Sequence, residues 1–271
     1  MAIDKQVVSH YLRKFRLLRL ADYLMFLRDA LKNRKSNQSF LKEHPGFIAP
    51  PAHLAFDAYN HTNWQAYYET GMIHAKLISD LVKEHISGDQ IRICEWGCGP
   101  ARVIRHLSQI DGFGKIELFG TDYNVQSVKW CRDHIKNVRF MANKLEPTLP
   151  LEPGQFDCVY AISIFTHLSE KLHYAWIEEL FRIMKPGGIL IFTTHGDVAA
   201  KRLLPEEKEK YDSGLLVTKS RTKEGKKLFA AYHPPKWVRE RLLKNYVVVK
   251  HINDASGYQL GQEVWCVKKR G

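Results

Sequence analysis

The segment Ile91–Arg102, which reads Ile-Arg-Ile-Cys-Glu-Trp-Gly-Cys-Gly-Pro-Ala-Arg, constrains this chain more than any other part. It predicts a short apolar strand that ends in Glu95, followed by a Gly-x-Gly turn and a helix. Because Gly97 and Gly99 have no side chain, the backbone of this turn can approach a ligand closely. A second predicted strand ends in Asp122, 27 residues after Glu95. The sequence therefore predicts an α/β sheet with an acidic residue at the end of two neighbouring strands.

The chemistry of these two acids indicates the ligand. The carboxylate of Glu95 can receive an ammonium group, and Asp122 is placed to accept hydrogen bonds from both hydroxyls of a ribose. An ammonium group beside a ribose describes S-adenosylmethionine. The alternative ligand is a dinucleotide, but its fingerprint requires a third glycine at the position of Arg102. We therefore expect S-adenosylmethionine as the cofactor.

Composition narrows the class of protein. With 271 residues, of which 45% are hydrophobic and 11% aromatic, the chain is long enough for one large globular domain and an extension. Its apolar runs are shorter than a membrane span, and no secretory signal is evident. The five cysteines form no ligand-spaced pair with histidines. We expect a cytoplasmic protein with reduced thiols and without a metal ion.

The net charge of +12 is concentrated in the two ends of the chain. Residues 1–44 carry +6, residues 45–196 carry −2 and residues 197–271 carry +8. Basic flanks suit an anionic substrate or an anionic membrane surface, and they equally suit solubility alone.

The N-terminal segment predicts a basic amphipathic helix over residues 4–35. Its apolar stripe recurs at steps of three and four residues and consists of Leu17, Leu20, Leu24, Leu27 and Leu31. One interpretation is peripheral contact with the inner face of the membrane. The other, which we favour, is a cap helix packed on the main domain or on a second subunit of a homodimer. The polar stretch Asn33–Ser39 predicts a loosening of the chain before the linker at Pro45-Gly46 and Pro50-Pro51.

The rest of the chain alternates strands and helices. Strands are predicted near 91–95, 116–121, 138–141, 156–162, 188–194, 246–252 and 262–268, and helices near 101–110, 124–135, 169–184 and 235–244. This order predicts a mainly parallel sheet covered on both faces, with a final hairpin that makes the last strand antiparallel. We predict an N-terminal cap and linker over 1–60 and a main domain over 61–271. Its polar insertion at about 197–232 is long enough to form a lid over a site.

From Trp64 onward the chain resembles the class I S-adenosylmethionine-dependent methyltransferases. The glycine turn, Asp122, the strand 156–161, the Lys185–Gly188 turn and the final hairpin follow the order of that family. The resemblance implies a Rossmann-like, seven-stranded sheet whose last strand is inserted between two others. More narrowly, the chain is similar to bacterial methyltransferases that modify sugars and polysaccharides, through the segments Pro50-Pro51, Phe165–Leu168, Thr194–Gly196 and Gln262–Val264.

The resemblance also implies the cofactor contacts. Gly97 and Gly99 pass under the methionine moiety, Glu95 reaches its amino group, and Cys98 and Arg102 complete the turn. The remaining contacts, given in the order of the chain with the part of the cofactor each meets, are Tyr68 (folded over the cofactor), Asp122 (ribose), Tyr123 and Asn143 (adenine), and Ser163 and Ile164 (sulfonium). The Asp/Asn-Pro-Pro-Tyr pattern of enzymes that methylate nucleobase amino groups is absent after the fourth strand.

An alcohol acceptor requires a base, and histidine serves near neutral pH. His167 follows the fourth predicted strand and His195 the fifth, at the sheet edge where ligands bind in such folds. His233 is a weaker candidate. We predict O-methylation of a sugar or glycan hydroxyl with a histidine base. The alternatives are O- or N-methylation of another small molecule, and RNA methylation, for which a dedicated binding module is lacking.

Overall fold

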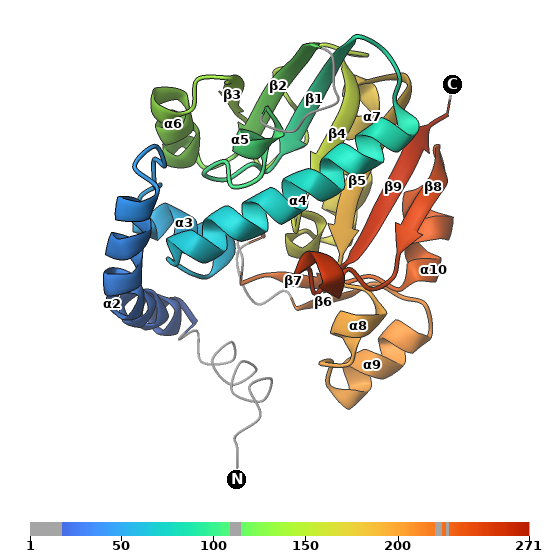
Figure 1. Cartoon of the computed structure of the whole chain (residues 1–271). Helices are drawn as coiled ribbons and strands as arrows, with labels where there is room; N and C mark the ends of the chain where they lie inside the picture. The colour runs from blue at the N-terminus through green and yellow to red at the C-terminus, as the bar shows by residue number, and fades with distance from the viewer. Residues whose placement is uncertain (1–17, 109–114, 220–223, 226–227, 271) are drawn as a thin grey trace.

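The computed structural model describes residues 18–108, 115–219, 224–225 and 228–270. Figure 1 shows a twisted sheet with helices on both faces. The strands are β1 (Gln90–Trp96), β2 (Lys115–Asp122), β3 (Val138–Ala142), β4 (Phe156–Ala161), β5 (Met184–Thr194), β8 (Tyr246–Ile252) and β9 (Glu263–Lys269). Their order is β3-β2-β1-β4-β5-β9-β8, and only the pairs of β9 with β5 and with β8 are antiparallel. The predicted fold class, including the inserted last strand, is confirmed.

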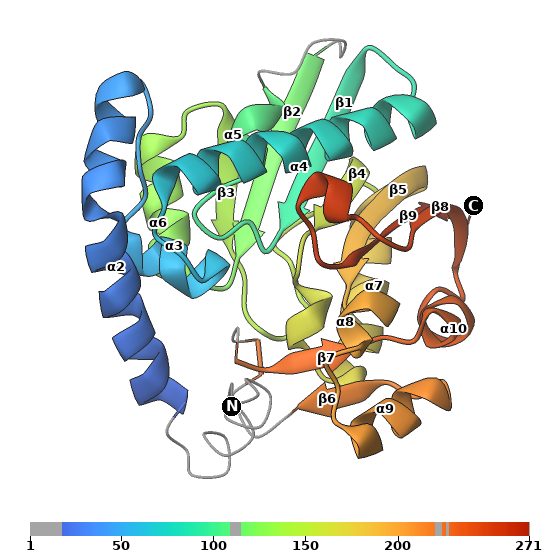
Figure 2. The same ribbon diagram turned by 60° about the horizontal axis from the view of Figure 1, so that its bottom comes forward.

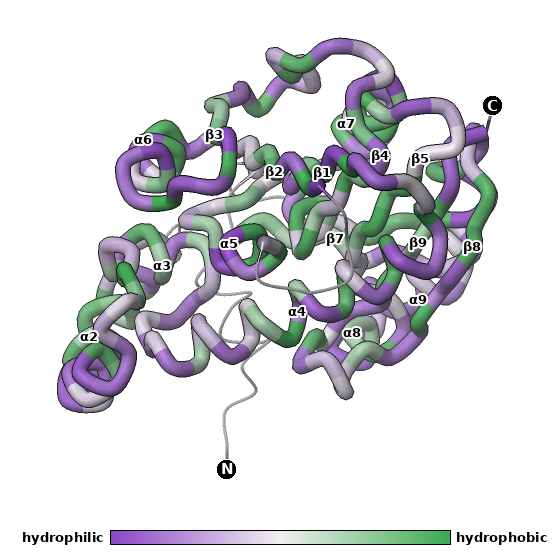
Figure 3. The backbone as a smooth tube through the Cα atoms, turned by 45° about the horizontal axis from the view of Figure 1, so that its top comes forward, coloured by the Kyte–Doolittle hydropathy of each residue, from purple (hydrophilic) through white to green (hydrophobic). Residues whose placement is uncertain are grey.

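Each face of the sheet has its own helices and its own apolar core. Helices α4 (Trp64–His85), α5 (Ile104–Leu107) and α6 (Val125–His134) cover one face. The other face is covered by α7 (Glu170–Ile183), α10 (Pro235–Trp237) and the π-helical turn η2 (Val238–Leu242). In Figure 3 the sheet runs between α4 and α5 on one side and α7 on the other.

Alternation along the strands divides the apolar residues between these two cores. On β1, Ile91 and Ile93 join the core beneath α4, whereas Cys94 and Trp96 join the core beneath α7. Glu95 shares the side of Ile93 and is therefore directed under the helices that follow the glycine turn.

The predicted helices match these elements, with two corrections in the N-terminal region. Helix α2 (Leu18–Glu43) runs through the predicted break at Asn33–Ser39. It continues because Asn33 and Asn37 face the main domain, where Asn37 Nδ2 donates to Thr62 O at 2.7 Å and its Oδ1 accepts from Trp64 N at 2.9 Å. The second correction is α3 (Ala52–Tyr59), a helix within the predicted linker.

Helix α2 docks by the face opposite to its leucine stripe. The docking side includes Phe26, which contacts Phe56 of α3, and Asp29, whose Oδ2 accepts from Thr62 N at 2.6 Å. Leu20, Leu24, Leu27 and Leu31 are exposed by 59%, 56%, 39% and 73%. The leucine stripe is therefore not the face by which α2 packs on the main domain. Leu17 and the predicted helix from residue 4 lie outside the described residues.

The predicted insertion 197–232 carries regular structure of its own. It contains α8 (Asp197–Ala200), α9 (Pro205–Asp212) and the two-stranded sheet of β6 (Val217–Lys219) and β7 (Ala230–Tyr232). Figure 2 shows these elements together beyond the carboxyl ends of the parallel strands. They are placed where a Rossmann-like sheet binds its ligands.

Candidate cofactor and acceptor site

The glycine turn after β1 adopts a backbone that requires glycine. Gly97 has φ +77° and Gly99 has φ +49°. A Cβ atom on Gly97 would lie 2.1 Å from Ile164 Cδ1, and one on Gly99 would lie 3.1 Å from the hydroxyl of Tyr59. Ala101 has φ +60°, a strained value for a residue with a side chain. Glycine would adopt this φ without strain.

Asp122 holds the turn in place from the end of β2. Its Oδ2 accepts from Gly99 N at 2.8 Å and its Oδ1 from Asn124 N at 2.7 Å. The carboxylate is 6% exposed. Since each carboxylate oxygen can accept more than one hydrogen bond, this position is compatible with the predicted ribose contact.

Glu95 lies beneath the turn, where its carboxyl group accepts a hydrogen bond from the backbone. Its Oε2 accepts from Ile104 N at 3.2 Å, and only 4% of the residue is exposed. Burial raises the pKa of Glu95 to about 8, against the effect of the nearby Tyr160 hydroxyl. A cation brought next to this carboxyl group would favour its ionised form. The predicted contact with the amino group of the cofactor stays a prediction.

A small cavity of about 50 Å³ joins several of the predicted cofactor residues. Its lining includes Gly97, Asp122, Tyr123, Asn143, Ile164 and His167. The Ile164 side chain rests on Gly97, so a ligand larger than this cavity requires Ile164 to move.

Asn143 carries a buried acceptor that fits the predicted adenine contact. Its Nδ2 donates to Lys144 O at 2.6 Å, but its Oδ1 is buried and has no partner among the described residues. A buried acceptor without a donor is costly, and the exocyclic amino group of adenine is a donor of the required kind. Asn143, the glycine turn and Asp122 together fit S-adenosylmethionine.

Both predicted histidines are oriented by one strand of the insertion. His167 Nδ1 lies 2.7 Å from the carbonyl oxygen of Phe229, the residue before β7. His195 Nδ1 lies 3.1 Å from the carbonyl oxygen of Ala231, within β7. A carbonyl only accepts, so both Nδ1 atoms carry the proton and both Nε2 atoms present a lone pair. Burial lowers the pKa of His167, and it lowers that of His195 to about 4, with a further contribution from His167. Both side chains are therefore neutral at pH 7.

Gln262 connects His195 to Ser163, and the sequence analysis did not select it as a site residue. Gln262 Oε1 accepts from Ser163 Oγ at 3.1 Å and from Thr193 Oγ1 at 2.5 Å. Its Nε2 consequently faces His195 Nε2, at 3.5 Å. Ser163 has φ +62°, and its N donates to Thr193 Oγ1 at 2.8 Å. Only the motif Gln262–Val264 pointed to this position.

Six predicted cofactor residues do not line this cavity, namely Tyr68, Glu95, Cys98, Gly99, Arg102 and Ser163, and neither does the predicted catalytic His195. The ring of Tyr68 packs 5.1 Å from His106, on the other side of α4, and this corrects its predicted placement over the cofactor. Arg102 lies over the Tyr59 ring at 4.4 Å and donates to Thr70 Oγ1 at 3.0 Å. Cys98 is buried, with its Sγ directed at Gly99 O.

Tyrosines other than Tyr68 contact the turn. The Tyr59 hydroxyl donates to Cys98 O at 3.3 Å, and the Tyr67 hydroxyl donates to Pro100 O at 2.6 Å. His233 also lies away from the cavity. It is fully buried, and its Nε2 lies 2.7 Å from His173 Nε2.

No group of three or more potential metal-ligating side chains occurs in the described ranges. No helix in these ranges has the length and apolar character needed to cross a membrane. All five cysteines are free and buried.

Residues 93–188, which contain this turn and both acids, match a family model described as a methyltransferase domain. This match spans 96 of the 271 residues of the chain. A solved S-adenosylmethionine-dependent methyltransferase from Methanosarcina mazei has the same fold, with a TM-score of 0.51 and 15% identity over 70% of this chain and 97% of that one. The fold is that of the class I methyltransferases, and the matched family model supports S-adenosylmethionine, the cofactor that the sequence predicts.

Two curated relatives have different acceptors. A malonyl-[acyl-carrier protein] O-methyltransferase of Bacillus anthracis is 31% identical over 134 residues, which cover 49% of this chain and 47% of the relative. A tRNA N(3)-methylcytidine methyltransferase of Schizosaccharomyces pombe is 25% identical over 124 residues, which cover 43% and 40%. The chain thus spans less than half the length of either relative.

Proposed function

We propose that this chain transfers a methyl group from S-adenosylmethionine to a hydroxyl oxygen of a small acceptor, and that the acceptor is a sugar or glycan. The observation that carries the proposal is the position of His167. Its ring lines the same cavity as Asp122 and Asn143, with its Nε2 unprotonated.

In this proposal Gly97, Gly99, Asp122 and Asn143 hold the cofactor, which supplies an electrophilic methyl group when bound. His167 Nε2 accepts the proton of the acceptor hydroxyl, a role that contributes about 10²–10⁴-fold to a rate. The bond from His167 Nδ1 to Phe229 O keeps Nε2 available for that proton. His195, oriented in the same way, contacts the acceptor or serves as the base in its place.

The insertion 197–232 is proposed as the lid that selects the acceptor. It adjoins the site, because β7 provides the bond to His195 and the neighbouring bond to His167. Its sequence contains nine basic and six acidic side chains, and this net positive charge suits a phosphate or carboxylate on the acceptor. We propose a cytoplasmic location, which suits five free cysteines.

Two other acceptor classes are supported by specific observations. O- or N-methylation of another small molecule is supported by the relative whose name specifies an O-methyltransferase acting on malonyl-acyl-carrier protein. RNA methylation is supported by the net charge of +12 and by the tRNA methyltransferase relative. RNA binding depends steeply on salt, so absence of RNA affinity at low ionic strength removes this alternative.

The test has two stages. Calorimetry with S-adenosylmethionine and its demethylated product first measures cofactor binding. Labelled cofactor is then incubated with nucleotide sugars, glycans, RNA and cell extract, and mass spectrometry locates the added methyl group. Cofactor binding without transfer to any sugar hydroxyl contradicts the proposed acceptor, whereas absence of cofactor binding contradicts the whole proposal.

For the outer face of α2, we propose a second copy of this chain as the partner. Leu20, Leu24, Leu27 and Leu31 are spaced 4, 3 and 4 residues apart, the spacing of a two-helix seam. All four leucine side chains are exposed. An anionic membrane, supported by Arg28, Lys32 and Lys35 on the same helix, is the alternative outcome of the test.

A further inference from the structure

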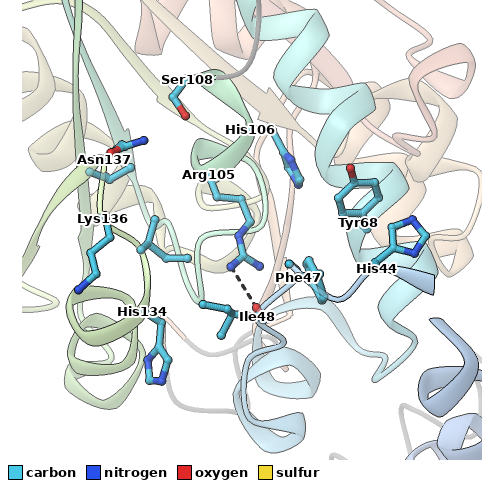
Figure 4. Close-up of a pocket in the computed structure, with 13 residues that line it drawn as sticks. His44, Phe47, Ile48, Tyr68, Arg105, His106, Ser108, His134, Lys136 and Asn137 are labelled. Atoms are coloured by element: carbon cyan, nitrogen blue, oxygen red, sulfur yellow. Dashed lines mark hydrogen bonds between the residues drawn. The ribbon is translucent and has the colours of Figure 1, made fainter. Parts of the chain in front are cut away.

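A second cavity, of about 420 Å³, lies apart from the cofactor site. It is bounded by the ends of α5 and α6, the start of β3 and the loop after α2, as Figure 4 shows. The ten-residue helix α6 separates it from the cofactor residues, since Tyr123 precedes that helix and His134 ends it. Ten helical residues span about 15 Å. A small ligand cannot occupy both cavities.

The lining of this cavity is basic. It includes Arg105, Lys136 and the three histidines His44, His106 and His134, and it contains no aspartate or glutamate. Ser108 and Asn137 add neutral hydrogen-bonding groups. In Figure 4 Arg105 lies between Lys136 and His134 on one side and His44 and Tyr68 on the other. Positive charge converging from separate elements without a carboxylate to neutralise it favours an anionic ligand.

Arg105 is held in place before any ligand binds. Its Nη2 donates to Ile48 O at 3.0 Å, and its guanidinium lies 4.9 Å from the Phe47 ring and 5.7 Å from the Trp130 ring. A guanidinium stacked on aromatic rings and fixed by a backbone carbonyl has lost most of its rotamer freedom. Little further ordering of this side chain is needed on binding.

One nitrogen of the same guanidinium lacks a hydrogen-bond partner. Arg105 Nη1 is buried and meets no acceptor within the part of the chain that the structure describes. A buried charged donor without an acceptor is destabilising, so the guanidinium gains more from a nearby anionic charge than a fully solvated one would. This unsatisfied nitrogen is the observation that distinguishes the cavity from an ordinary basic surface.

We propose that this cavity binds the phosphate group of a small molecule of nucleoside monophosphate size. A phosphate offers three acceptor oxygens, which match a fixed guanidinium, an ammonium group and the neutral donors around them. The volume of the cavity falls within the usual range of small-molecule sites. Because the site is separate from the cofactor cavity, its ligand is an effector and not the methyl acceptor.

The test is calorimetry on the full chain with inorganic phosphate, pyrophosphate, uridine monophosphate and uridine, beside a titration with S-adenosylmethionine. Arg105→Gln removes the fixed charge. Lys136→Met removes an exposed charge at the rim of the cavity, and Lys171→Met on α7 is the matched control outside the cavity. We expect uridine monophosphate to bind the wild type, the first two variants to bind it at least tenfold more weakly, and the control to bind it unchanged.

The two exposed substitutions keep the experiment interpretable if Arg105→Gln fails to fold. Equal binding of uridine and uridine monophosphate, or equal affinity of wild type and Lys136→Met, overturns the proposal. Binding of a short RNA without binding of the monophosphate also overturns it and indicates a nucleic-acid surface instead. Unchanged S-adenosylmethionine affinity in all variants is expected, so failure of this proposal is distinct from failure of the methyltransferase proposal.

Discussion

Replacement of Asn143 by leucine is expected to weaken cofactor binding and to leave folding intact or improved. In the free protein Asn143 Oδ1 is buried without a donor, at a cost of about 1–3 kcal/mol. The adenine amino group would supply that donor. Leucine has a similar shape and no acceptor. In the bound state the substitution therefore removes the hydrogen bond to adenine, whereas in the free state it removes only the cost of an unpaired acceptor.

The magnitudes follow from this difference. A loss of about 1–3 kcal/mol on the bound side corresponds to about 5- to 150-fold lower affinity for S-adenosylmethionine. The free energy of unfolding without cofactor should stay equal or rise by up to about 2 kcal/mol. The one bond lost from the free protein is that of Asn143 Nδ2 to Lys144 O, which is exposed and contributes little.

Calorimetry measures the affinity, and urea unfolding of the cofactor-free protein measures the stability. Asn143→Asp keeps an acceptor at the same position and should retain most of the affinity. If the leucine variant bound S-adenosylmethionine as tightly as the wild type, Asn143 would not contact adenine. If it bound weakly but also unfolded more easily, the buried oxygen would be satisfied in the free protein and the reasoning would be wrong.

Four further predictions concern other parts of the chain. His167→Ala should lower kcat by about 10²–10⁴-fold at unchanged cofactor affinity, and His195→Ala should lower it less; unchanged turnover in both would exclude a histidine base. Ala101→Gly should raise the free energy of unfolding by about 0.5–1 kcal/mol in urea titrations, because φ +60° strains alanine by more than glycine costs in chain entropy. Burial lowers the pKa of His173 to about 4 from 6.5, so the unfolded chain binds more protons and stability should fall as the pH drops from 6.5 to 4; His173→Phe should flatten this dependence in thermal melts. Leu24→Glu should convert a dimer to a monomer in light scattering, whereas a wild-type monomer that binds anionic vesicles through this helix would assign the face to a membrane.

The sheet could be predicted because its signals are local. Each parallel strand is a short apolar run, and the Gly-x-Gly turn and the acids at strand ends fall at fixed distances along the chain. Asp122 and Asn143 follow adjacent strands, so the topology alone places them at one edge.

The errors arose where tertiary contacts decide. Asn33–Ser39 was predicted to break the helix on propensity, but the asparagines there bond to the segment before α4. The prediction for Tyr68 rested on the helix that carries it and not on the direction in which its side chain points. Successive residues on a helix point about 100° apart, so Tyr67 reaches the glycine turn and Tyr68 faces His106. Gln262 lies 99 residues from Ser163, and only the inserted antiparallel strand brings the two together.

The insertion and the proposed base form one unit. His167 and His195 follow β4 and β5 of the sheet, but the carbonyls that fix their tautomers come from Phe229 and Ala231, at and within β7. A displacement of β7 would therefore break the hydrogen bonds that both Nδ1–H groups donate. It would allow the other tautomer, in which Nε2 is a donor and cannot accept a proton. The position of the insertion over the site and the tautomer of the proposed base thus depend on the same strand, which couples acceptor recognition to catalysis in this proposal.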